Sequence, residues 1–362
     1  MPRRTVTMLA STLVLITLLC VGVLLPVPYA RMGPGPTFNT LGEARGEPVL
    51  QVSGHRTYPT SGHLNMTTVR VTGADYRMNA VEAVYGWLTH DSLVVPRETI
   101  YPDGKTEEES TQENAEEFSQ SQEAAKVAAL GELGIPVTTR VVVASVVKDS
   151  PAEGTLHAGD VIKAVDGVPV VEPGDVAERV TKREPGEKVA FTIVPAEEAA
   201  AAEKAGKEPT TTRTVDITTV KSPEGDRAVV GIQAGTDHVF PFTIDIKLDD
   251  VGGPSAGLMF ALGIVDKLTP ESLTDGKFIA GTGTIDEKGE VGPIGGIEMK
   301  LVGARDAGAR YFLTPADNCE AAAADTPAGL TLIKVDTIDD ATKALAKLRG
   351  GDTASLPACA KG

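Results

Sequence analysis

The sequence predicts an α+β protein of about two folded units behind an N-terminal apolar helix. The chain has 362 residues, which is more than one hydrophobic core usually organises. Hydrophobic residues make up 41% and charged residues 23%, the composition of a globular protein. Short β-branched runs between Gly and Pro turns occur alongside segments with apolar residues at helical spacing, so both strands and helices are expected.

The first element is a helix long enough to cross a membrane. Thr5–Leu25 carries no charge and is rich in Leu, Val and Ile. At about 1.5 Å per residue it reaches roughly the 30 Å of a bilayer's hydrocarbon core. Arg3 and Arg4 precede it, so the positive-inside tendency places the N-terminus in the cytoplasm and the remaining chain outside, as a single-pass signal anchor. The alternative is a cleaved secretory signal, and in both cases the bulk is exported.

Charge and cysteine content fit an exported protein. The net charge of -16, without a basic stripe, predicts no nucleic-acid partner, because such binding depends on clustered Lys and Arg. Cys20 lies inside the apolar run, whereas Cys319 and Cys359 would both face an oxidising exterior. A pair there could form a disulfide, and the sequence leaves open whether the two backbones approach closely enough.

The next stretch predicts a connector, then strands and helices. Gly33–Leu41 reads GPGPTFNTL, a proline-glycine connector that would lift the exported part off the membrane. The expected strands are Val49–Val52 and Asn65–Val71, and the expected helices are Met78–Leu88 and Thr111–Leu133. Glu107–Glu109 form an acidic patch beside Gly104, which we interpret as a solvated loop rather than a metal site.

A second unit follows, in which several turn-forming Gly, Pro and Asp residues separate short expected strands. A strand is expected over Arg140–Val147, and Ser150–Val170 reads SPAEGTLHAGDVIKAVDGVPV, with Gly-Asp and Asp-Gly turns around the strand Val161–Val165. A helix is expected over Asp175–Arg183 and a strand over Lys188–Val194. The low-complexity segment Pro195–Thr212 predicts a partly helical hairpin insertion.

This unit resembles a PDZ domain of the kind attached to bacterial exported proteases. The resemblance implies capture of an extended peptide as an added strand beside Val141, Val142 and Val143. The expected glycine-containing carboxylate loop is matched only in part by Leu133-Gly134-Ile135, which Pro136 interrupts. A unit that only packs against or restrains its neighbour is the alternative.

The densest chemical signal begins at residue 242. A strand is expected over Thr243–Leu248, and Asp249–Gly253 makes a turn whose glycines allow unusual backbone angles. Pro254 suits the first helical position, so Ser255 is expected in the first turn of a helix over Ser255–Lys267. Free N–H groups gather at such a helix start and would stabilise an oxyanion beside the serine. On this fragment alone, Ser255 is better explained as a helix cap, because most serines that follow a Gly-Gly turn have that role.

A second fragment adds a lysine. Phe278–Thr282 predicts a strand, and VGPIGGIEMK leads from Val291 into a helix that carries Lys300. Together the two fragments resemble the proteolytic domain of the Lon family. The matching residues are Gly253-Pro254-Ser255-Ala256-Gly257, Thr282-Gly283, and Pro293-Ile294-Gly295-Gly296 followed by Lys300.

The Lon resemblance implies acyl transfer by Ser255 as nucleophile and Lys300 as base, with Thr282 orienting the pair and Gly252 and Gly253 forming the oxyanion turn. A lysine pKa near 10.4 must fall to about 7 or 8 for this role, which costs about 4 kcal/mol and requires burial. Many Lon proteases carry an acidic residue where this chain has Gly252, and a glutamate where it has Thr284.

The predicted whole is an ATP-independent serine endopeptidase that needs no cofactor. No G-x-x-x-x-G-K-S/T phosphate loop occurs in the sequence. The PDZ domain, residues 136–222, is expected to interrupt a Lon-like domain formed by residues 37–135 and 223–350, as in membrane-anchored Lon-like proteases. Exported or unfolded polypeptides are the expected substrates, and a homo-oligomer is possible. The alternatives are a catalytically silent peptide-binding scaffold and a signal-peptidase-like hydrolase.

Overall fold

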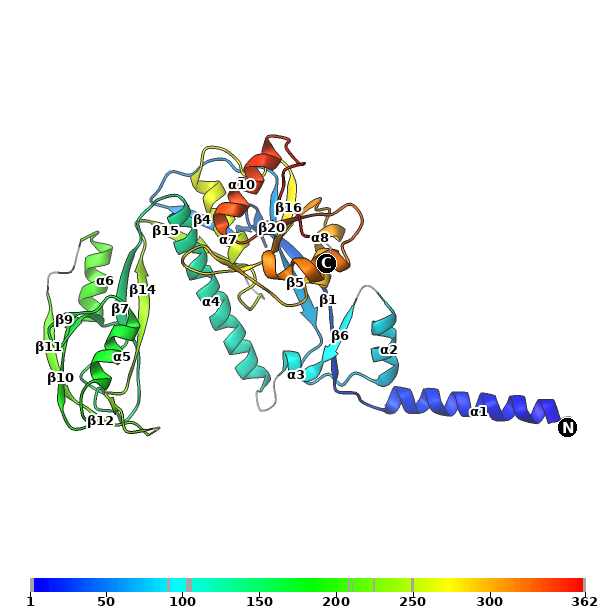
Figure 1. The fold of residues 1–362 in the computed structure, drawn as a ribbon, viewed down its shortest axis with the longest axis horizontal. Coiled ribbons are helices and arrows are strands. Elements are labelled where there is room, and N and C mark those ends of the chain that lie inside the picture. The colour runs from blue at the N-terminus through cyan, green and yellow to red at the C-terminus, as the bar shows by residue number, and fades with distance from the viewer. Residues whose placement is uncertain are drawn as a thin grey trace. The chain divides into compact units, whose positions relative to one another are not determined.

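The computed structural model describes residues 3–89, 92–101, 106–207, 209, 211–223, 225–248 and 251–360. The chain forms two compact units of mixed helices and sheets, which confirms the α+β class (Figure 1). The first unit contains the chain up to Ile135 and again from Phe242 onward. The second unit, Pro136–Pro241, is therefore an insertion between two segments of the first.

The N-terminal helix α1 (Arg3–Leu24) is the blue end of the ribbon in Figure 1. Its stretch Arg4–Leu24 has 21 residues and a mean hydropathy of 2.4, and its apolar window is not buried. In the part of the chain that the structure describes, it is the one helix long and apolar enough to cross a membrane. It covers nearly all of the predicted span, residues 5–25.

A six-stranded mixed sheet forms the centre of the first unit, with the strand order β20-β19-β16-β5-β1-β6. The strands are β1 (Tyr29–Asn39), β5 (His63–Val71), β6 (Leu93–Pro96), β16 (Phe278–Gly281), β19 (Tyr311–Pro315) and β20 (Thr331–Val335). β5 runs antiparallel to β1 and parallel to β16. The pairing of Leu64 with Ile279 thus joins the segment before the insertion to the segment after it.

Three short two-stranded ribbons complete the strands of this unit. They are β2 (Glu43–Ala44) with β3 (Glu47–Pro48), β4 (Leu50–Ser53) with β15 (Thr243–Ile246), and β17 (Thr284–Ile285) with β18 (Val291–Gly292). The β4–β15 ribbon, like the central sheet, pairs chain from both sides of the insertion.

Helix α7 (Gly257–Leu268) is buried along nearly its whole length, because apolar residues occupy almost every position. Helix α4 (Glu107–Glu132) packs beside it, with the rings of Phe118 and Phe260 edge to face at 5.8 Å between centroids. The remaining helices of the unit are α2 (Ala80–Leu88), α3 (Arg97–Ile100), α8 (Ile297–Asp306), the 3-10 turn η1 (Ala316–Asn318), α9 (Cys319–Ala324) and α10 (Ile338–Arg349).

The interpretation of Glu107–Glu109 as a solvated loop is wrong, since these residues form the first turn of α4. The Thr106 side chain accepts a hydrogen bond from the Glu109 backbone N–H, and the Glu109 carboxylate accepts one from the Thr106 N–H. Acidic residues are favoured at this end of a helix by its macrodipole. Gly104 lies outside the described residues.

The second unit is a sheet with the order β11-β10-β8-β7-β14 and a short strand β9 beside β8. The strands are β7 (Thr138–Val146), β8 (Val161–Val165), β9 (Val168–Pro169), β10 (Lys188–Val194), β11 (Arg213–Thr218) and β14 (Ile232–Val239). Helix α5 (Pro173–Thr181) buries Val176 and Val180 in a core with Val143, Ile162 and Phe191. The predicted hairpin insertion contains helix α6 (Ala196–Lys204) between the paired strands β10 and β11.

The second unit ends later than the predicted boundary at residue 222. A hairpin of β12 (Val220–Lys221) and β13 (Ala228–Val229) follows that position, and then β14 pairs with β7 along its whole length, from Ile232 with Val146 to Val239 with Thr138. Because β14 completes this sheet, the chain rejoins the first unit only at Phe242.

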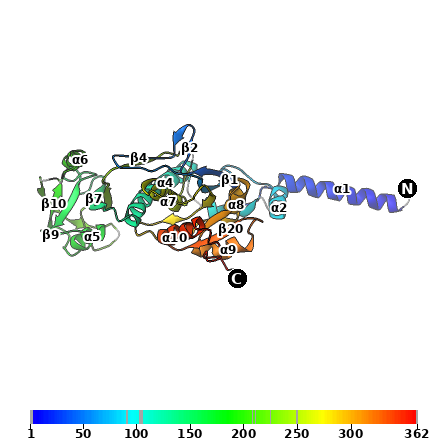
Figure 2. The ribbon, with the colours of Figure 1, turned by 90° about the horizontal axis from the view of Figure 1, so that it is seen from above.

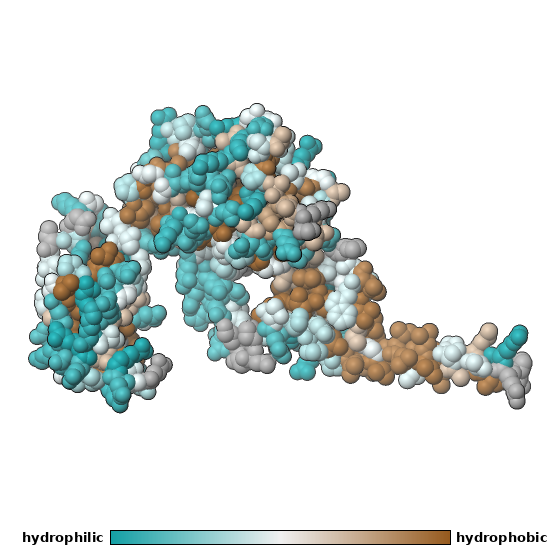
Figure 3. Space-filling view, in the orientation of Figure 1, coloured by the Kyte–Doolittle hydropathy of each residue, from teal (hydrophilic) through white to brown (hydrophobic). Residues whose placement is uncertain are grey.

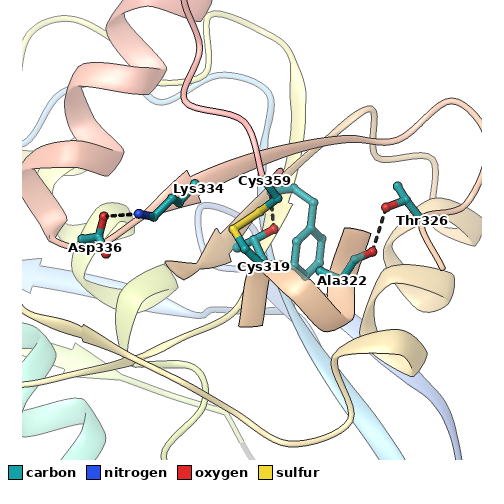
Figure 4. Close-up of a disulfide and its surroundings, with 8 residues drawn as sticks. Cys319, Ala322, Thr326, Lys334, Asp336 and Cys359 are labelled. Carbon is teal, nitrogen blue, oxygen red and sulfur yellow. Dashed lines mark hydrogen bonds and ion pairs between the residues drawn. A yellow bond between two sulfur atoms is a disulfide. The ribbon is translucent and has the colours of Figure 1, made fainter. Parts of the chain in front are cut away.

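A disulfide links Cys319 to Cys359, with a Cα–Cα distance of 5.0 Å (Figure 4). Cys319 begins α9, and Cys359 belongs to the C-terminal tail, which also accepts a hydrogen bond from the Lys334 N–H at the Pro357 carbonyl. The possibility that the sequence left open is therefore realised. Cys20 on α1 is exposed and has a free thiol.

Candidate active site

Ser255 lies in a tight turn between Gly253 and helix α7. Gly253 has a φ of +79°, which favours glycine. The helix begins at Gly257 with Ala256 as its N-cap, so the prediction that Ser255 lies in the first helical turn is wrong. The Ser255 carbonyl accepts hydrogen bonds from the Gly283 N–H at 2.9 Å and from the Thr282 hydroxyl at 3.0 Å. Two donors therefore fix the backbone that carries the serine.

Lys300 reaches Ser255 from helix α8. Its Nζ donates a hydrogen bond of 2.8 Å to Ser255 Oγ and another of 2.9 Å to Thr282 Oγ1. The lysine is only 2% exposed, and its neighbours Met299 and Leu301 are buried as well. Burial lowers the pKa of Lys300 to about 7, because the low-dielectric surroundings disfavour its charged form.

Thr282 follows β16 and is fully buried. Its hydroxyl hydrogen is used in the bond to the Ser255 carbonyl, so Oγ1 can only accept from Lys300. This arrangement orients one N–H of the lysine toward Thr282. The structure thus brings Ser255, Lys300 and Thr282 into one hydrogen-bonded group.

The backbone N–H groups of Gly252 and Gly253 differ in whether they are free to donate a hydrogen bond. The Gly253 N–H donates a 2.9 Å hydrogen bond to the Asn114 carbonyl of α4, so it is not a free oxyanion donor as predicted. The N–H groups of Gly252, Ser255 and Ala256, in contrast, have no acceptor among the described residues. The first N–H groups of α7 are also engaged, for example that of Leu258 with the Gly283 carbonyl.

Helix α4 supports the serine turn at two points that the sequence did not reveal. The Ser121 hydroxyl donates a 2.9 Å hydrogen bond to the Pro254 carbonyl, one residue before the serine. A Cβ on Gly252 would come within 2.9 Å of the Asn114 Cβ, so glycine is needed where α4 approaches. These are long-range contacts without a local sequence signal.

Another support for the site is Asn318, which precedes the disulfide-bonded Cys319. Its side chain accepts from the Ile294 N–H and donates to the Ile294 carbonyl, both at 2.9 Å. Ile294 lies in the loop that leads through Gly296 into α8. Asn318 therefore fixes the approach to the helix that carries Lys300, although no sequence feature marks it.

The serine and lysine open onto a cavity of about 310 Å³. Its lining residues are Pro36, Phe38, Thr68, Val69, Arg70, Val251, Gly252, Ser255, Ala256 and Lys300. Ser255 and Lys300 thus lie at the wall of a recess that combines apolar and polar surface. Within the described ranges, no group of three or more His, Cys, Asp or Glu side chains is placed to hold a metal ion.

The predicted peptide-binding strand of the second unit is not available to a peptide. Val141, Val142 and Val143 lie on β7, which pairs with β14 on one side and with β8 on the other. All three side chains are buried in cores of the unit. A peptide cannot add a strand beside these residues, so this site prediction is wrong.

A groove instead runs between α5 and β14, the last strand of the sheet. The cavity measures about 670 Å³, and Val176, Ala177 and Val180 of α5 line it together with Ile232 and Ala234 of β14. At the start of β14, Gly231 has a φ of +81° between Val230 and Ile232. The hydrophobic-Gly-hydrophobic signal sought before β7 occurs here, after the other strands of the unit.

Two family models match the chain. Residues 249–347 match the Lon protease (S16) C-terminal proteolytic domain, and residues 117–198 match the PDZ domain. The first match includes Ser255, Thr282 and Lys300, and the second includes the strands β7, β8 and β10.

Curated Lon proteases match about a quarter of the chain. The Lon protease of Campylobacter concisus is 41% identical over 95 residues, which is 25% of this chain and 12% of that protein. Lon protease 1 of Sorangium cellulosum is 42% identical over 101 residues, 27% of this chain and 12% of that protein. The chain thus spans about an eighth of the length of these relatives.

Among solved structures, the PDZ domain of an SdrC-like protein from Listeria monocytogenes is 24% identical, with a TM-score of 0.21, and covers 26% of this chain and 86% of that one. The family matches identify the two parts of the molecule directly. The chain carries a Lon-type C-terminal proteolytic domain and a PDZ domain behind an apolar N-terminal helix.

Proposed function

We propose that the protein is a serine endopeptidase in which Ser255 attacks the peptide bond and Lys300 is the base. The observation that carries this proposal is the 2.8 Å hydrogen bond between Lys300 Nζ and Ser255 Oγ in a buried site. A lysine with a pKa of about 7 is neutral in about half of the molecules at neutral pH. It can then accept the serine proton, which an ordinary lysine cannot do.

The proposed reaction has two acyl-transfer steps. Neutral Lys300 takes the proton from Ser255 Oγ as this oxygen bonds to the substrate carbonyl carbon. The resulting ammonium gives a proton to the leaving amine, and the peptide C–N bond breaks to leave an ester on Ser255. Water then repeats the sequence and releases the acid. Thr282 keeps one lysine N–H engaged throughout, so that the nitrogen lone pair stays directed at the serine.

Backbone N–H groups beside the serine would stabilise the oxyanion. Those of Gly252 and Ala256 are the best candidates, since both residues line the cavity with Ser255 and neither N–H has an acceptor within the described chain. Gly253 has a different role: its bond to Asn114 holds the turn against α4.

The second unit would deliver extended polypeptides. β14 is the last strand of the sheet among the described residues, and its position beside an apolar groove suits a peptide that adds as a strand, with apolar side chains in the groove. The turn at Val230-Gly231-Ile232 is the natural position for a terminal carboxylate. Unfolded polypeptides, which expose such segments, are the proposed substrates.

The setting of the reaction is proposed to be outside the cytoplasm and independent of ATP. The apolar α1, preceded by Arg3 and Arg4, supports a single-pass anchor with the bulk of the chain exported. The lack of a phosphate-loop motif in these 362 residues supports turnover without nucleotide.

Purified full-length protein in detergent, incubated with an unfolded protein and without nucleotide, tests the proposal. Wild type should cleave the substrate and react with a serine-directed fluorophosphonate, while Ser255→Ala should do neither. Lys300→Arg should lose at least a hundredfold in kcat, because a guanidinium stays protonated. The double variant should be no worse than either single one.

A different result would favour a peptide-binding scaffold. If wild type binds the unfolded protein but never cleaves it, the chain is catalytically silent. If Lys300→Arg keeps near wild-type turnover, the lysine is not the base.

A further inference from the structure

An apolar patch covers the outer side of helix α2 in the first unit. Its members are large hydrophobic or aromatic side chains between 40% and 77% exposed: Tyr76, Val81, Val84, Tyr85, Trp87 and Leu88. Apart from the stretch Val6–Leu25, no other large hydrophobic side chain of this unit is exposed among the described residues. Surface patches of this kind mark a binding face when they are contiguous.

The sequence of α2 departs from that of an ordinary surface helix. Its inner positions Ala83 and Gly86 are buried against the unit, so the outer face would normally be polar. Glu82 is the one charged residue of α2, and its carboxylate accepts hydrogen bonds from the Tyr76 hydroxyl and the Asn79 N–H. These donors hold the half-buried Glu82 carboxylate, and the outer positions of α2 carry only aromatic and aliphatic groups.

This patch adjoins the end of α1. The Ala80 N–H donates to the Leu25 carbonyl at 3.2 Å, and Val27 N–H donates to the Met78 carbonyl at 2.9 Å. A Cβ on Gly22 would lie 3.2 Å from the Val81 side chain. Figure 3 shows the hydrophobic colour of α1 continuing onto the region of α2, and in Figures 1 and 2 α2 lies at the inner end of α1.

We propose that the outer face of α2 lies in the headgroup region of the membrane that α1 crosses. Tyr and Trp side chains are enriched at this depth, where an apolar ring and a polar N–H or O–H are both satisfied. α2 lies beside the end of α1 in space, and an apolar helix face at that position would rest in the interface plane. The occupant of the patch is the lipid surface, and this inference rests on the anchoring role proposed for α1.

Continuity with α1 favours lipid over a second copy of the chain. A membrane around α1 must end close to Leu25, and hydrogen bonds hold Ala80 and Met78 of the α2 region at that point. Trp87 is further fixed by an edge-to-face contact with Tyr29 at 5.3 Å. The patch is therefore carried rigidly at the level where the hydrocarbon meets the headgroups.

This second contact would restrain the orientation of the first unit relative to the membrane. A single helix alone would leave the first unit free to tilt, whereas a second contact beside it restrains that motion. The β1 strand links the two features directly, because it begins at Tyr29, beside Trp87, and pairs with β5 and β6 of the central sheet.

Trp87 is the only tryptophan of the chain, so its fluorescence reports on the patch without engineering. The experiment places full-length protein in phosphatidylcholine–phosphatidylglycerol vesicles with acyl chains brominated near the ester bonds or near the methyl ends. We expect at least twofold quenching by the shallow bromines, weaker quenching by the deep ones and poor access for acrylamide. Trp87→Phe supplies the blank.

Charged substitutions on the outer face of α2 should remove Trp87 from contact with the lipid. Val84→Asp with Leu88→Asp is expected to remove most of the lipid quenching and restore acrylamide access, because both side chains point away from the unit. Val171→Asp is the matched control, since Val171 is 81% exposed on the second unit. It should leave the Trp87 signal unchanged.

Two outcomes overturn the inference. Trp87 quenched by acrylamide but not by brominated lipid would place α2 in water, and Trp87 shielded from both would place another copy on the patch. Alkaline extraction separates these from a failed anchor, because protein released from the vesicles lacks an inserted α1. No readout needs turnover, so a failure here is distinct from a failure of the proposed peptidase.

Discussion

The burial of Lys300 has two effects: it lowers the pKa of the lysine and it reduces the stability of the folded protein. Its Nζ contacts two neutral hydroxyls, and no carboxylate pairs with it among the residues described. Removing an ammonium from water without a counter-ion is unfavourable, so the folded protein prefers the neutral amine. The same burial that would supply the proposed base near neutral pH therefore reduces stability at every pH at which the unfolded lysine is charged.

This cost predicts a pH dependence of both stability and rate. Between the folded pKa of about 7 and the ordinary value near 10.4, the unfolded chain holds a proton that the folded chain lacks. The lysine's contribution to the free energy of unfolding should therefore rise by about 2 kcal/mol from pH 7 to pH 9. Over the same range kcat/KM should rise through about pH 7 and level off.

Urea unfolding of the full chain, measured from pH 6 to pH 9, checks the stability effect. Lys300→Met should lack this increment, because methionine does not titrate. Identical pH profiles for wild type and Lys300→Met would show that the lysine's pKa is the same folded and unfolded.

Sequence reasoning at this scale singled out Ser255 and Lys300, which lie within hydrogen-bond distance in the structure, but it did not predict their local structure. Ser255 and Lys300 stand in short motifs with a recognisable pattern. The start of α7 was misplaced because Pro254 is compatible with both a helix and a turn. The turn forms instead, with the Gly257 N–H bonded to the Pro254 carbonyl. The bond that occupies Gly253 comes from Asn114, which is remote in sequence, so no local pattern could indicate it.

At the scale of elements, α4 serves as a support for the serine turn. Its Ser121 hydroxyl and Asn114 carbonyl hold two successive residues ahead of Ser255. The helix is well suited to this role because it packs on the buried α7 through Phe118.

We expect Ser121→Ala to lower kcat about fivefold to tenfold with little change in KM. The reason is that the Pro254 carbonyl loses its donor and the serine turn becomes less well ordered, at a cost of about 1 kcal/mol. Steady-state kinetics on a short peptide measures this split. Ser119→Ala, on the exposed side of the same helix, is the control. An effect on KM alone would contradict a positioning role.

The groove of the second unit gives another test. Ala177 is exposed on α5 and faces the groove, so Ala177→Trp should fill it without disturbing the core. Affinity for an unfolded polypeptide should fall at least tenfold, measured with the Ser255→Ala background to prevent cleavage. Ala201→Trp, exposed on α6, should bind normally. Equal affinity in both variants would exclude the groove as the binding site.

The elements of this unit were partly predictable. The strands Val161–Val165 and Lys188–Val194 were expected with their observed bounds, because sharp Gly-Asp and Asp-Gly turns or a β-branched run define them. The binding edge was assigned to β7 because a carboxylate loop was sought before it. The strand that offers the edge, β14, comes last in this unit, and pairing order is a property of the whole sheet.

For the whole molecule, the disulfide closes the last part of the chain on itself. Cys319 and Cys359 are separated by 40 residues, and a loop of that size corresponds to about 4 kcal/mol in the chain-entropy model. Cys359→Ser should therefore lower the free energy of unfolding by about 2 to 4 kcal/mol.

Calorimetry of the oxidised full chain measures the change, and Cys20→Ser should have no effect, since that thiol is free and exposed on α1. Thiol labelling of denatured, unreduced wild type should modify Cys20 alone. Labelling of all three cysteines would show that the bond is absent in solution.

The inserted arrangement depends on pairings that no single segment reveals. Leu64 with Ile279 in the central sheet, and β4 with β15, each join chain on both sides of the second unit. The sequence could suggest that the second unit interrupts the first, because segments before and after it both resemble parts of a Lon proteolytic domain. It could not set the return point at Phe242, which depends on β14 pairing with β7.

The Cys319–Cys359 disulfide also depends on the compartment in which the chain is located. Such a bond forms in oxidising compartments and stays open in a reducing cytoplasm. Beside it, Asn318 holds Ile294 in the loop before the helix of Lys300. A chain that has not met an oxidising compartment would therefore lack the covalent bond next to Asn318. If the protein is exported, as proposed, this bond would form only after the chain has left the cytoplasm.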